Sequence, residues 1–327
     1  MRRIDASTID LNLLVVLREL VLERSVTRAG RRLHLTQSAT SHALARLRVV
    51  LGDPLLVRSG REMKLTPRAE ALATDLPRLF RSIERVLAAE AGFDPATSER
   101  VFLLGAPDFA SVMLPGVVER LARRVPRAGL EFLVTDEGVE RELMEGRLDL
   151  ALASPLPGRA DGVLSEELPR VSWAVFVRKG HPAAHGWCRG AWEQWPHVLV
   201  RRGRETVGPV QRRLLERGLR RRVGAYVPQF VHAAPLLAAT DMMLLSPLVA
   251  MAPLAPRFGL VALEAPVDLA PVLPRMHTRA ELAHDPALGA LREVVRGAFT
   301  ELVADAERAA VVRLRDGGRK ARAPRAR

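Results

Sequence analysis

The sequence predicts an N-terminal winged helix-turn-helix that is mainly α, then a linker helix, then an α/β domain of two lobes. Three observations support this fold class. Apolar residues recur at helical spacing between turn signals over 10–72, one long amphipathic helix follows, and short apolar strands alternate with helices after Arg100. A chain of 327 residues is also long enough for two or three domains.

The expected boundaries follow the breaks in this pattern. We assign 1–66 to the winged helix-turn-helix, 67–92 to the linker helix, and 93–305 to the α/β domain. Within the α/β domain, the first lobe takes about 98–167 and 270–305, and the second takes about 168–269. We expect the basic tail, 306–327, to be disordered because it is poor in apolar residues.

The first two helices are predicted from spacing and caps. Leu11, Leu14, Leu17 and Val21 recur at helical spacing and define the inward stripe of a supporting helix. Ser25 is an N-cap for the second helix, because its hydroxyl can accept a hydrogen bond from a backbone N–H.

The third helix is predicted from Thr36, its N-cap, to about Leu51. At about 100° per residue, its core-facing residues are Thr40, Ala43, Leu44, Leu47 and Leu51. The opposite side is small and rich in hydrogen-bonding groups, which suits entry into the major groove of double-stranded DNA. The residues predicted to contact DNA are Thr36, Gln37, Ser38, Ser41, His42 and Arg46. The alternative is an ordinary three-helix surface whose polar side is solvated.

A basic wing follows the third helix. Gly52-Asp53-Pro54 is a turn signal, and Leu55-Leu56-Val57 and Met63-Lys64-Leu65 are short strands joined by a turn. Such a wing reaches the phosphate backbone or the minor groove beside the recognition helix. We therefore predict positioning contacts, which carry no base specificity, from Arg58, Arg61 and Lys64.

These motifs together resemble the N-terminal winged helix-turn-helix of LysR-type transcriptional regulators. The segments that carry the resemblance are Asp10-Leu11-Asn12-Leu13-Leu14, Ser25-Val26-Thr27-Arg28-Ala29, Thr36-Gln37-Ser38-Ala39, Leu44-Ala45-Arg46-Leu47-Arg48, Gly52-Asp53-Pro54-Leu55-Leu56-Val57-Arg58 and Leu65-Thr66-Pro67-Arg68-Ala69. The chain departs from the family pattern at Gly30 (usually Ala), His34 (often small) and Thr40 (usually apolar). Gly30 should weaken its helix by about 1 kcal/mol relative to Ala, and Thr40 puts a hydroxyl near the core.

Charge is segregated along the chain, whose formal net charge is +13. The segment 1–68 contains 13 basic and 6 acidic residues, and the segment 306–327 contains 8 basic and 2 acidic residues. The stretch between them balances at 29 and 29. This distribution favours phosphate neutralisation by the two ends. The tail either strengthens non-specific DNA binding or is a solvated extension without a role.

The linker helix begins at the Thr66 cap and Pro67, a favoured pair for a helix start. Apolar residues at spacings of four and three form a short coiled-coil-like seam, and we expect it to pair two chains through Leu72, Leu76, Leu79 and Ile83. The alternative is a helix that packs on its own domain. Pro77 removes a backbone hydrogen bond and should kink the helix.

In the α/β domain, strands are expected at 101–105, 130–135, 148–153, 173–177, 197–200, 222–227 and 242–245. Helices are expected at 110–124, 139–145, 209–217, 232–239, 248–255 and 286–305. The βαβαβ order predicts parallel sheet covered on both faces. The domain resembles the periplasmic-binding-protein-like effector domain of the same regulators, through Glu142-Leu143, Gly146-Arg147-Leu148-Asp149-Leu150-Ala151, Gly180-His181-Pro182, Thr240-Asp241 and Asp285-Pro286.

A ligand site is expected in the cleft between the lobes, beyond the carboxyl ends of the strands. The effector-binding candidates there are Asp108, Phe109, Thr135, Ser154, Arg202, Pro228, Gln229, Phe230 and Ser246. Phe109 and Phe230 can flank an aromatic ligand, and helix N-termini with Thr135 or Arg202 can take a carboxylate. Ordinary loop residues, and a cleft that binds nothing, are the alternatives.

The resemblance implies a sequence-specific transcriptional regulator that acts as a dimer or tetramer and responds to a small-molecule effector. It is nearest the branch of nodulation and aromatic-catabolism regulators, and RNA polymerase is a further candidate partner. Against an enzyme, we find no catalytic constellation, cofactor motif or clustered metal ligands; the single cysteine, Cys188, fits a reducing compartment. No signal peptide or membrane span is evident, so we expect a cytoplasmic protein and no solute-transport role.

Overall fold

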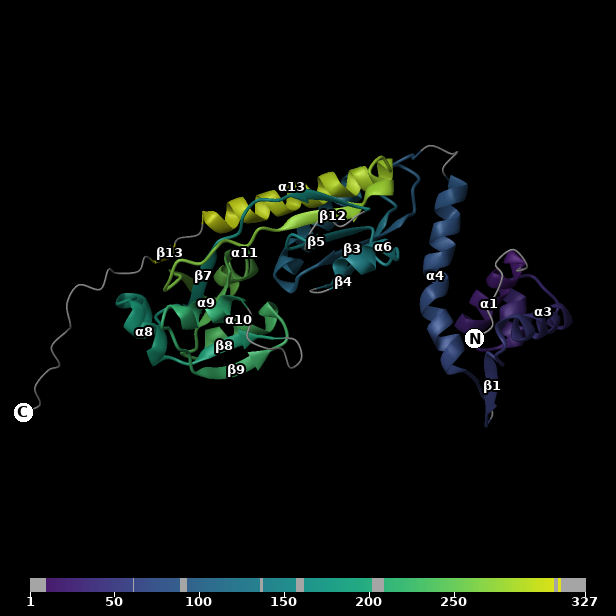
Figure 1. Ribbon diagram of the computed structural model, residues 1–327, viewed down its shortest axis with the longest axis horizontal. Helices are drawn as coiled ribbons and strands as arrows, with labels where there is room; N and C mark the ends of the chain where they lie inside the picture. The colour runs from purple at the N-terminus through teal and green to yellow at the C-terminus, as the bar shows by residue number, and fades with distance from the viewer. Residues whose placement is uncertain are drawn as a thin grey trace, which may run out of the picture. The chain divides into compact units, whose positions relative to one another are not determined.

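The computed structural model describes residues 10–60, 62–88, 93–135, 138–156, 162–201, 209–308 and 311–312 (Figure 1). These residues fall into two compact units, 1–92 and 93–327, and each unit is described by itself. Among the described residues, none of the helices combines the length and the apolar character that a membrane span requires.

The first unit consists of three short helices, a two-stranded wing and one long helix. Its elements are α1 (Leu11–Glu23), α2 (Val26–Arg32), α3 (Gln37–Leu51), β1 (Leu56–Ser59), β2 (Glu62–Leu65) and α4 (Pro67–Ala88). The side chains of Asp10, Ser25 and Thr36 each accept a hydrogen bond from a backbone N–H in the first turn of the helix that follows. The predicted caps of α2 and α3 are therefore confirmed.

The buried face of α1 differs from the predicted one at its first turn. Leu11 is 62% exposed, whereas Leu13, Val16, Leu17 and Leu20 lie in the core of the unit. The segment is apolar on most of its circumference, so its spacing alone allowed more than one inward face. Packing against α2, α3 and α4 selects the face.

A hydrogen-bonded corner joins the wing to α4. The Asp53 carboxylate accepts from the Thr66 hydroxyl (2.6 Å) and from the backbone N–H of Leu55 (2.7 Å). The Thr66 hydroxyl oxygen in turn accepts from the backbone N–H of Ala69 (3.1 Å), which confirms the predicted cap. These bonds hold Leu55, whose side chain is buried, at a left-handed φ of 61°. The helix α4 then continues through Pro77.

Two sheets and a separate strand pair form the frame of the second unit. The first lobe is a five-stranded sheet in the order β4 (Gly129–Val134), β3 (Val101–Ala106), β5 (Leu150–Ala153), β12 (Arg275–Arg279), β6 (Val163–Glu167). The second lobe holds the order β10 (Leu244–Pro247), β7 (Trp173–Arg178), β11 (Leu260–Glu264), β13 (Val311–Val312). Its strand pair is β8 (His197–Val200) and β9 (Val223–Val227).

Helices cover these sheets. They are the 3-10 helix η2 (Asp108–Met113), α5 (Leu114–Arg124), α6 (Val139–Met144), α7 (Pro182–His185), α8 (Arg189–Gln194), α9 (Pro209–Glu216), α10 (Phe230–Ala239), α11 (Leu248–Met251), α12 (Ala255–Phe258), the 3-10 helix η3 (Ala280–Leu282) and α13 (Pro286–Glu307). Helix α13 packs against α5 and the 3-10 helix η2.

The sheets are mixed, which corrects the prediction of parallel sheet. β3 is parallel to β4 and β5, but β12 is antiparallel to β5 and β6, and β7 is antiparallel to β10 and β11. The sequence prediction omitted β6, β11, β12 and β13. β6 and β12 contain charged side chains, so neither has the apolar run of a buried parallel strand.

One hydrophobic core extends through both lobes. It joins Phe102 and Leu150 of the first sheet to Phe176 of β7, Val198 of β8 and Phe299 of α13, all of them almost fully buried. The 3-10 helix η2 of the first lobe also packs on α11 of the second. The two lobes are therefore packed together rather than separated by an open cleft.

Candidate nucleic-acid interface and effector cleft

The outer face of α3 has the arrangement that the sequence predicts. Thr36, Gln37, Ser38, Ser41 and His42 are all exposed, whereas the inward residues Thr40, Leu44 and Leu47 are buried and Ala43 and Leu51 are half-buried. The Thr36 hydroxyl caps the helix and lies 3.0 Å from the Ser38 hydroxyl. The α3 N-terminus therefore presents free backbone N–H groups and small polar side chains to solvent.

The predicted DNA contact Arg46 is held by an acidic residue. Its guanidinium donates to the Asp10 carboxylate at 3.3 Å, and the Arg46 side chain is 60% exposed. A phosphate can replace the carboxylate because both are oxyanions that match a guanidinium. Sequence spacing gave no sign of this pair, since Asp10 lies 36 positions away and caps a different helix.

Carboxylates on α1 also hold two arginines of α2. Arg28 and Arg32 pair with Glu23, and Arg32 also pairs with Glu19, which is buried. The hydrogen bonds from Arg32 and then Arg28 lower the pKa of Glu23. These arginines brace α2 against α1, whereas the exposed Arg31 makes no ion pair within the described part of the unit.

The wing is an antiparallel hairpin in which Ser59 faces Glu62, and its Gly60 has a left-handed φ of 65°. Arg58 and Lys64 are exposed, as phosphate contacts must be. Arg61 lies outside the described residues. Sequence reasoning missed Arg48, whose guanidinium donates to the backbone carbonyls of Pro54 (2.8 Å) and Leu56 (3.1 Å). Arg48 thus fixes the wing to the recognition helix.

The three positions that depart from the family pattern meet at the turn. The Thr40 side chain is fully buried, and its hydroxyl donates to the Thr36 carbonyl at 3.0 Å. A Cβ placed on Gly30 would lie 2.6 Å from the Thr40 hydroxyl oxygen and 3.1 Å from the Leu35 carbonyl oxygen. His34 makes the turn with a left-handed φ of 55°. Glycine at position 30 therefore provides the space that Thr40 occupies.

The predicted seam of α4 is split between two environments. Leu76 is buried within the first unit and Leu72 packs on the same core, whereas Leu79 is 41% exposed and Ile83 is half-buried. A shallow apolar groove of about 230 Å³ runs between α1 and α4, with Leu22, Leu76 and Pro77 among its walls. Part of the seam therefore packs on its own domain, and part is available to a second chain.

In the second unit, one hydrogen bond joins the lobes at the predicted effector cleft. The Asp108 carboxylate accepts from the backbone N–H of Phe230 at 2.6 Å, and Asp108 is buried. Phe230 is the first residue of α10, so the carboxylate lies at the N-terminus of that helix, where partial positive charge favours an anion. The place expected for an effector carboxylate is thus occupied by the protein's own side chain.

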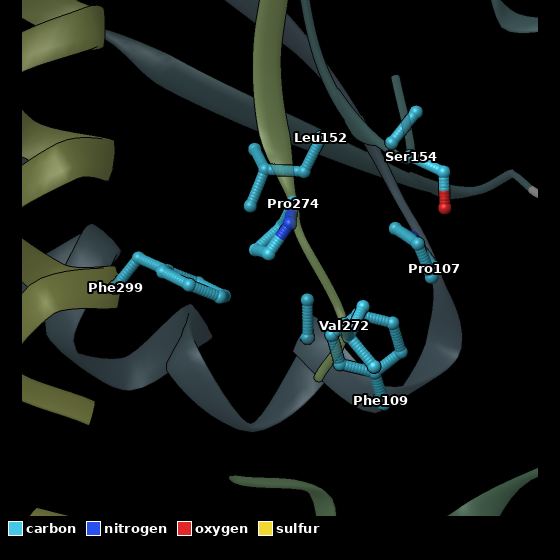
Figure 2. Close-up of a pocket in the computed structure, with 9 residues that line it drawn as sticks. Pro107, Phe109, Leu152, Ser154, Val272, Pro274 and Phe299 are labelled. Atoms are coloured by element: carbon cyan, nitrogen blue, oxygen red, sulfur yellow. The ribbon is translucent and has the colours of Figure 1, made fainter. Parts of the chain in front are cut away.

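Beside this contact lies a small cavity of about 10 Å³, room for about one water molecule (Figure 2). Its walls include the predicted Phe109 and Ser154, with Val272 and Pro274 of the segment that returns from the second lobe. Figure 2 shows Phe109 and Phe299 directed toward the same space. The lining is mainly apolar, but the space is too small for an aromatic ring unless the two lobes move apart.

Two predicted effector residues carry buried hydroxyls that lack a hydrogen-bond partner among the described residues. These are Thr135, just after β4, and Ser246, which is 0% exposed in β10. A buried polar group left unpaired costs about 1–3 kcal/mol, so each marks a place where a ligand or a water can bind. Gln229 and Phe230 are half-buried, Pro228 and Ser154 are exposed, and Arg202 lies outside the described residues.

Comparison with known families decides the identity. Residues 11–70 match the family model described as "Bacterial regulatory helix-turn-helix protein, lysR family", and residues 96–300 match the one described as "LysR substrate binding domain". The chain belongs to the LysR family. This LysR-family protein is a DNA-binding transcriptional regulator whose second unit is an effector-binding domain, as the resemblance implied.

Similar proteins cover most of the regulator. It is 33% identical over 300 residues to the HTH-type transcriptional activator NagR of a Ralstonia species, covering 91% of this chain and 99% of that one. It is 35% identical over 252 residues to Nodulation protein D 1 of Neorhizobium galegae, covering 71% and 76%. The crystal structure of the probable transcriptional regulator PA0477 from Pseudomonas aeruginosa is 32% identical, with a TM-score of 0.67 and coverage of 88% and 97%. The expected nodulation branch is therefore represented among its relatives.

Proposed function

We propose that the outer face of α3 reads base edges in the major groove through Gln37, Ser38, Ser41 and His42. The α3 N-terminus with Thr36 takes a phosphate, and Arg46 exchanges Asp10 for DNA. On the wing, Arg58, Arg61 and Lys64 hold the backbone. The observation that carries this proposal is the exposure of the small polar face of α3 beside its capped N-terminus.

The test is fluorescence anisotropy of the full chain on a duplex from the region upstream of its own gene. His42→Ala should weaken binding to that duplex by about 1–3 kcal/mol relative to a scrambled duplex, whereas Arg58→Ala should weaken binding to both alike. Val49→Ala is the matched control, because Val49 is 84% exposed on the same helix and lies beyond the polar face. Equal affinity of the wild type for both duplexes would refute sequence-specific reading.

We propose that α4 pairs two copies of the chain, through Leu79 and Ile83 with Leu72 at the edge. The exposure of Leu79 supports this, whereas Leu76 contributes mainly to the internal core. Leu79→Glu should give a monomer that remains folded, measured by light scattering and circular dichroism. Leu76→Glu should unfold the first unit, because it buries a charge in an apolar core. An unchanged mass for Leu79→Glu would contradict this assignment.

For the second unit, we propose an aromatic effector that carries a carboxylate and binds between the lobes. The apolar walls near Phe109, the half-buried Phe230 and the unpaired hydroxyls of Thr135 and Ser246 support this class. The effector carboxylate competes with Asp108 for the N-terminus of α10. Because Asp108 lies on the first lobe and Phe230 on the second, this exchange shifts the packing of the lobes.

The experiment compares benzoate with neutral benzyl alcohol by calorimetry on the wild type and on Asp108→Asn. Asparagine keeps the hydrogen-bond acceptor but removes the competing charge. Benzoate should therefore bind the variant more tightly by about 1.5–3 kcal/mol, the range for hydrogen bonds to charged groups. Benzyl alcohol should bind both alike. Weaker benzoate binding to the variant would show that Asp108 assists the ligand rather than competes with it.

We propose that the effector is bound without being transformed, since the related proteins are regulators. We propose RNA polymerase as the partner through which the bound regulator acts, supported by the relative described as a transcriptional activator. Its DNA target supports a cytoplasmic site of action.

A further inference from the structure

A run of arginines lies on the second lobe, far along the chain from the DNA-reading helix. Residues 209–222 hold six arginines, one glutamate and no lysine or aspartate. They form α9 and the turn that leads into β9, in the lobe that Figure 1 colours green. Because 69–305 as a whole is balanced at 29 basic and 29 acidic residues, this run is a local concentration of positive charge.

Four of these side chains are exposed and have no counter-ion among the described residues. Arg212, Arg217, Arg220 and Arg222 are exposed, and their guanidinium groups make no ion pair or side-chain hydrogen bond within the described residues. We call these four the arginine patch. Buried anchors fix the backbone beneath it, since Leu214 is 0% and Leu219 is 3% exposed and the N–H of Leu219 donates to the carbonyl of Leu214. The backbone that carries the patch is therefore fixed to the core of this lobe.

Two described carboxylates near the patch are already engaged. Glu216 pairs with Arg213 at 3.4 Å, and Glu193 accepts from the backbone N–H of Arg220 at 2.9 Å. A further cation joins the surface, because Arg189 donates to the carbonyl of Arg217. Arg221 is half-buried and donates to Gln211, and burial lowers its pKa to about 10. Within the described residues, no carboxylate side chain pairs with the four arginines of the patch.

We infer that the arginine patch is a second contact surface for the phosphate backbone of double-stranded DNA. Arginine guanidinium groups match phosphate oxygens in pairs, and duplex DNA carries one charge per about 1.7 Å. The centre of a protein–protein interface is usually depleted of charged residues, whereas among the residues of 209–222 whose exposure is described, Leu215 is the one exposed large hydrophobic residue. This inference rests on DNA as the partner of the first unit, and it extends the contact to the effector-binding unit.

The experiment measures the affinity of the full chain for a 70-base-pair random-sequence duplex at several salt concentrations. The patch variant carries Arg212→Gln, Arg217→Gln, Arg220→Gln and Arg222→Gln. Each lost phosphate contact lowers the slope of log affinity against log salt by about 0.9, so the variant should lose about 2–4 units of slope. The control variant carries Arg123→Gln, Arg127→Gln, Arg141→Gln and Arg257→Gln, which removes equal charge from other exposed sites. Its slope should fall by less than about one unit.

A second readout is independent of affinity. Arginine modification with p-hydroxyphenylglyoxal, read by mass spectrometry, should show that the duplex protects 209–222 but not Arg141. An unchanged slope for the patch variant, or equal losses in both variants, would overturn the inference. Protection by a 20-residue polyglutamate but not by DNA would assign the patch to an acidic protein and also overturn it. Wild-type chain that binds no duplex would instead refute DNA binding itself, which keeps the two failures distinct.

Discussion

The packing of Gly30 against Thr40 predicts that a residue usual in the family destabilises this protein. Alanine at position 30 of α2 would place its Cβ 2.6 Å from the Thr40 hydroxyl oxygen, closer than such atoms approach. Thr40 cannot move away freely, because it is fully buried and its hydroxyl donates to the Thr36 carbonyl at 3.0 Å. The backbone carbonyl of Leu35, 3.1 Å from the same Cβ, closes the other side.

Two opposing effects set the magnitude. Alanine in place of glycine within a helix stabilises it by about 1 kcal/mol. Overpacking of a filled core costs about 1–3 kcal/mol, and rotation of Thr40 would strand a buried hydroxyl at a further cost of about 1–3 kcal/mol. The net expectation is that Gly30→Ala lowers the stability of the first unit by about 1–3 kcal/mol. Thr40→Ala removes the clashing atoms, so the double variant should recover most of that loss.

The assay is hydrogen exchange of peptides from 26–47 in the full chain, with urea unfolding followed by circular dichroism. All four tryptophans lie in the second unit, so their fluorescence is an internal control that should not change. Gly289→Ala is the matched control: Gly289 lies in α13, and a Cβ there would meet nothing within 4 Å, so this variant should become more stable. Slower exchange in Gly30→Ala, or no recovery with Thr40→Ala, would refute the steric argument.

Three further outcomes follow from single contacts. Arg48→Ala should speed hydrogen exchange at 54–66 and cost about 1–2 kcal/mol, because the wing loses its bonds to α3. Arg100→Met should destabilise the second unit by about 2–3 kcal/mol at pH 7, measured by urea unfolding, because Arg100 lies 2.9 Å from Asp149 and from Asp285. Burial raises the pKa of Asp285, but Arg100 outweighs this effect and the pKa is lowered overall. The loss of stability in Arg100→Met should therefore shrink below about pH 4, where protonation neutralises the carboxylate. Burial lowers the pKa of His197 to about 4, so between about pH 6.5 and 4 the unfolded chain binds more protons than the folded chain. The free energy of unfolding should therefore fall by about 3 kcal/mol as the pH is lowered through that window. His197→Gln should flatten this dependence of stability on pH.

The sequence predicts the first unit well because its elements are short and locally encoded. Caps at Ser25, Thr36 and Thr66 each satisfy a backbone N–H within three residues, so their signal does not depend on distant packing. The outward face of α3 follows from spacing, since its apolar stripe is narrow. The buried face of α1 could not be predicted the same way, because α1 itself carries apolar residues on most of its circumference.

Pairing between distant segments is what the sequence does not reveal. Asp10 with Arg46, Asp108 with Phe230, and β12 with β5 and β6 are each separated by many residues. Loop residues such as Asp108 could be nominated for the cleft, but spacing does not show that its carboxylate already binds the N-terminus of α10. Gly30, His34 and Thr40, which depart from the family pattern, are likewise not adjacent in the sequence, and the turn between α2 and α3 brings them together.

Ion pairing changes what the basic charge of the first unit can contribute to DNA binding. Arg28 and Arg32 are neutralised by α1 carboxylates, Arg46 by Asp10, and Arg48 is committed to wing carbonyls. Each of these must lose a partner before it meets a phosphate, so it adds less affinity than a free cation. Among the described residues of the first unit, the exposed cations Arg24, Arg31 and Lys64 make no ion pair, and they are far fewer than the 13 basic residues that precede Ala69. The salt dependence of DNA binding should therefore be shallower than that count implies, unless arginines outside the first unit also reach the backbone.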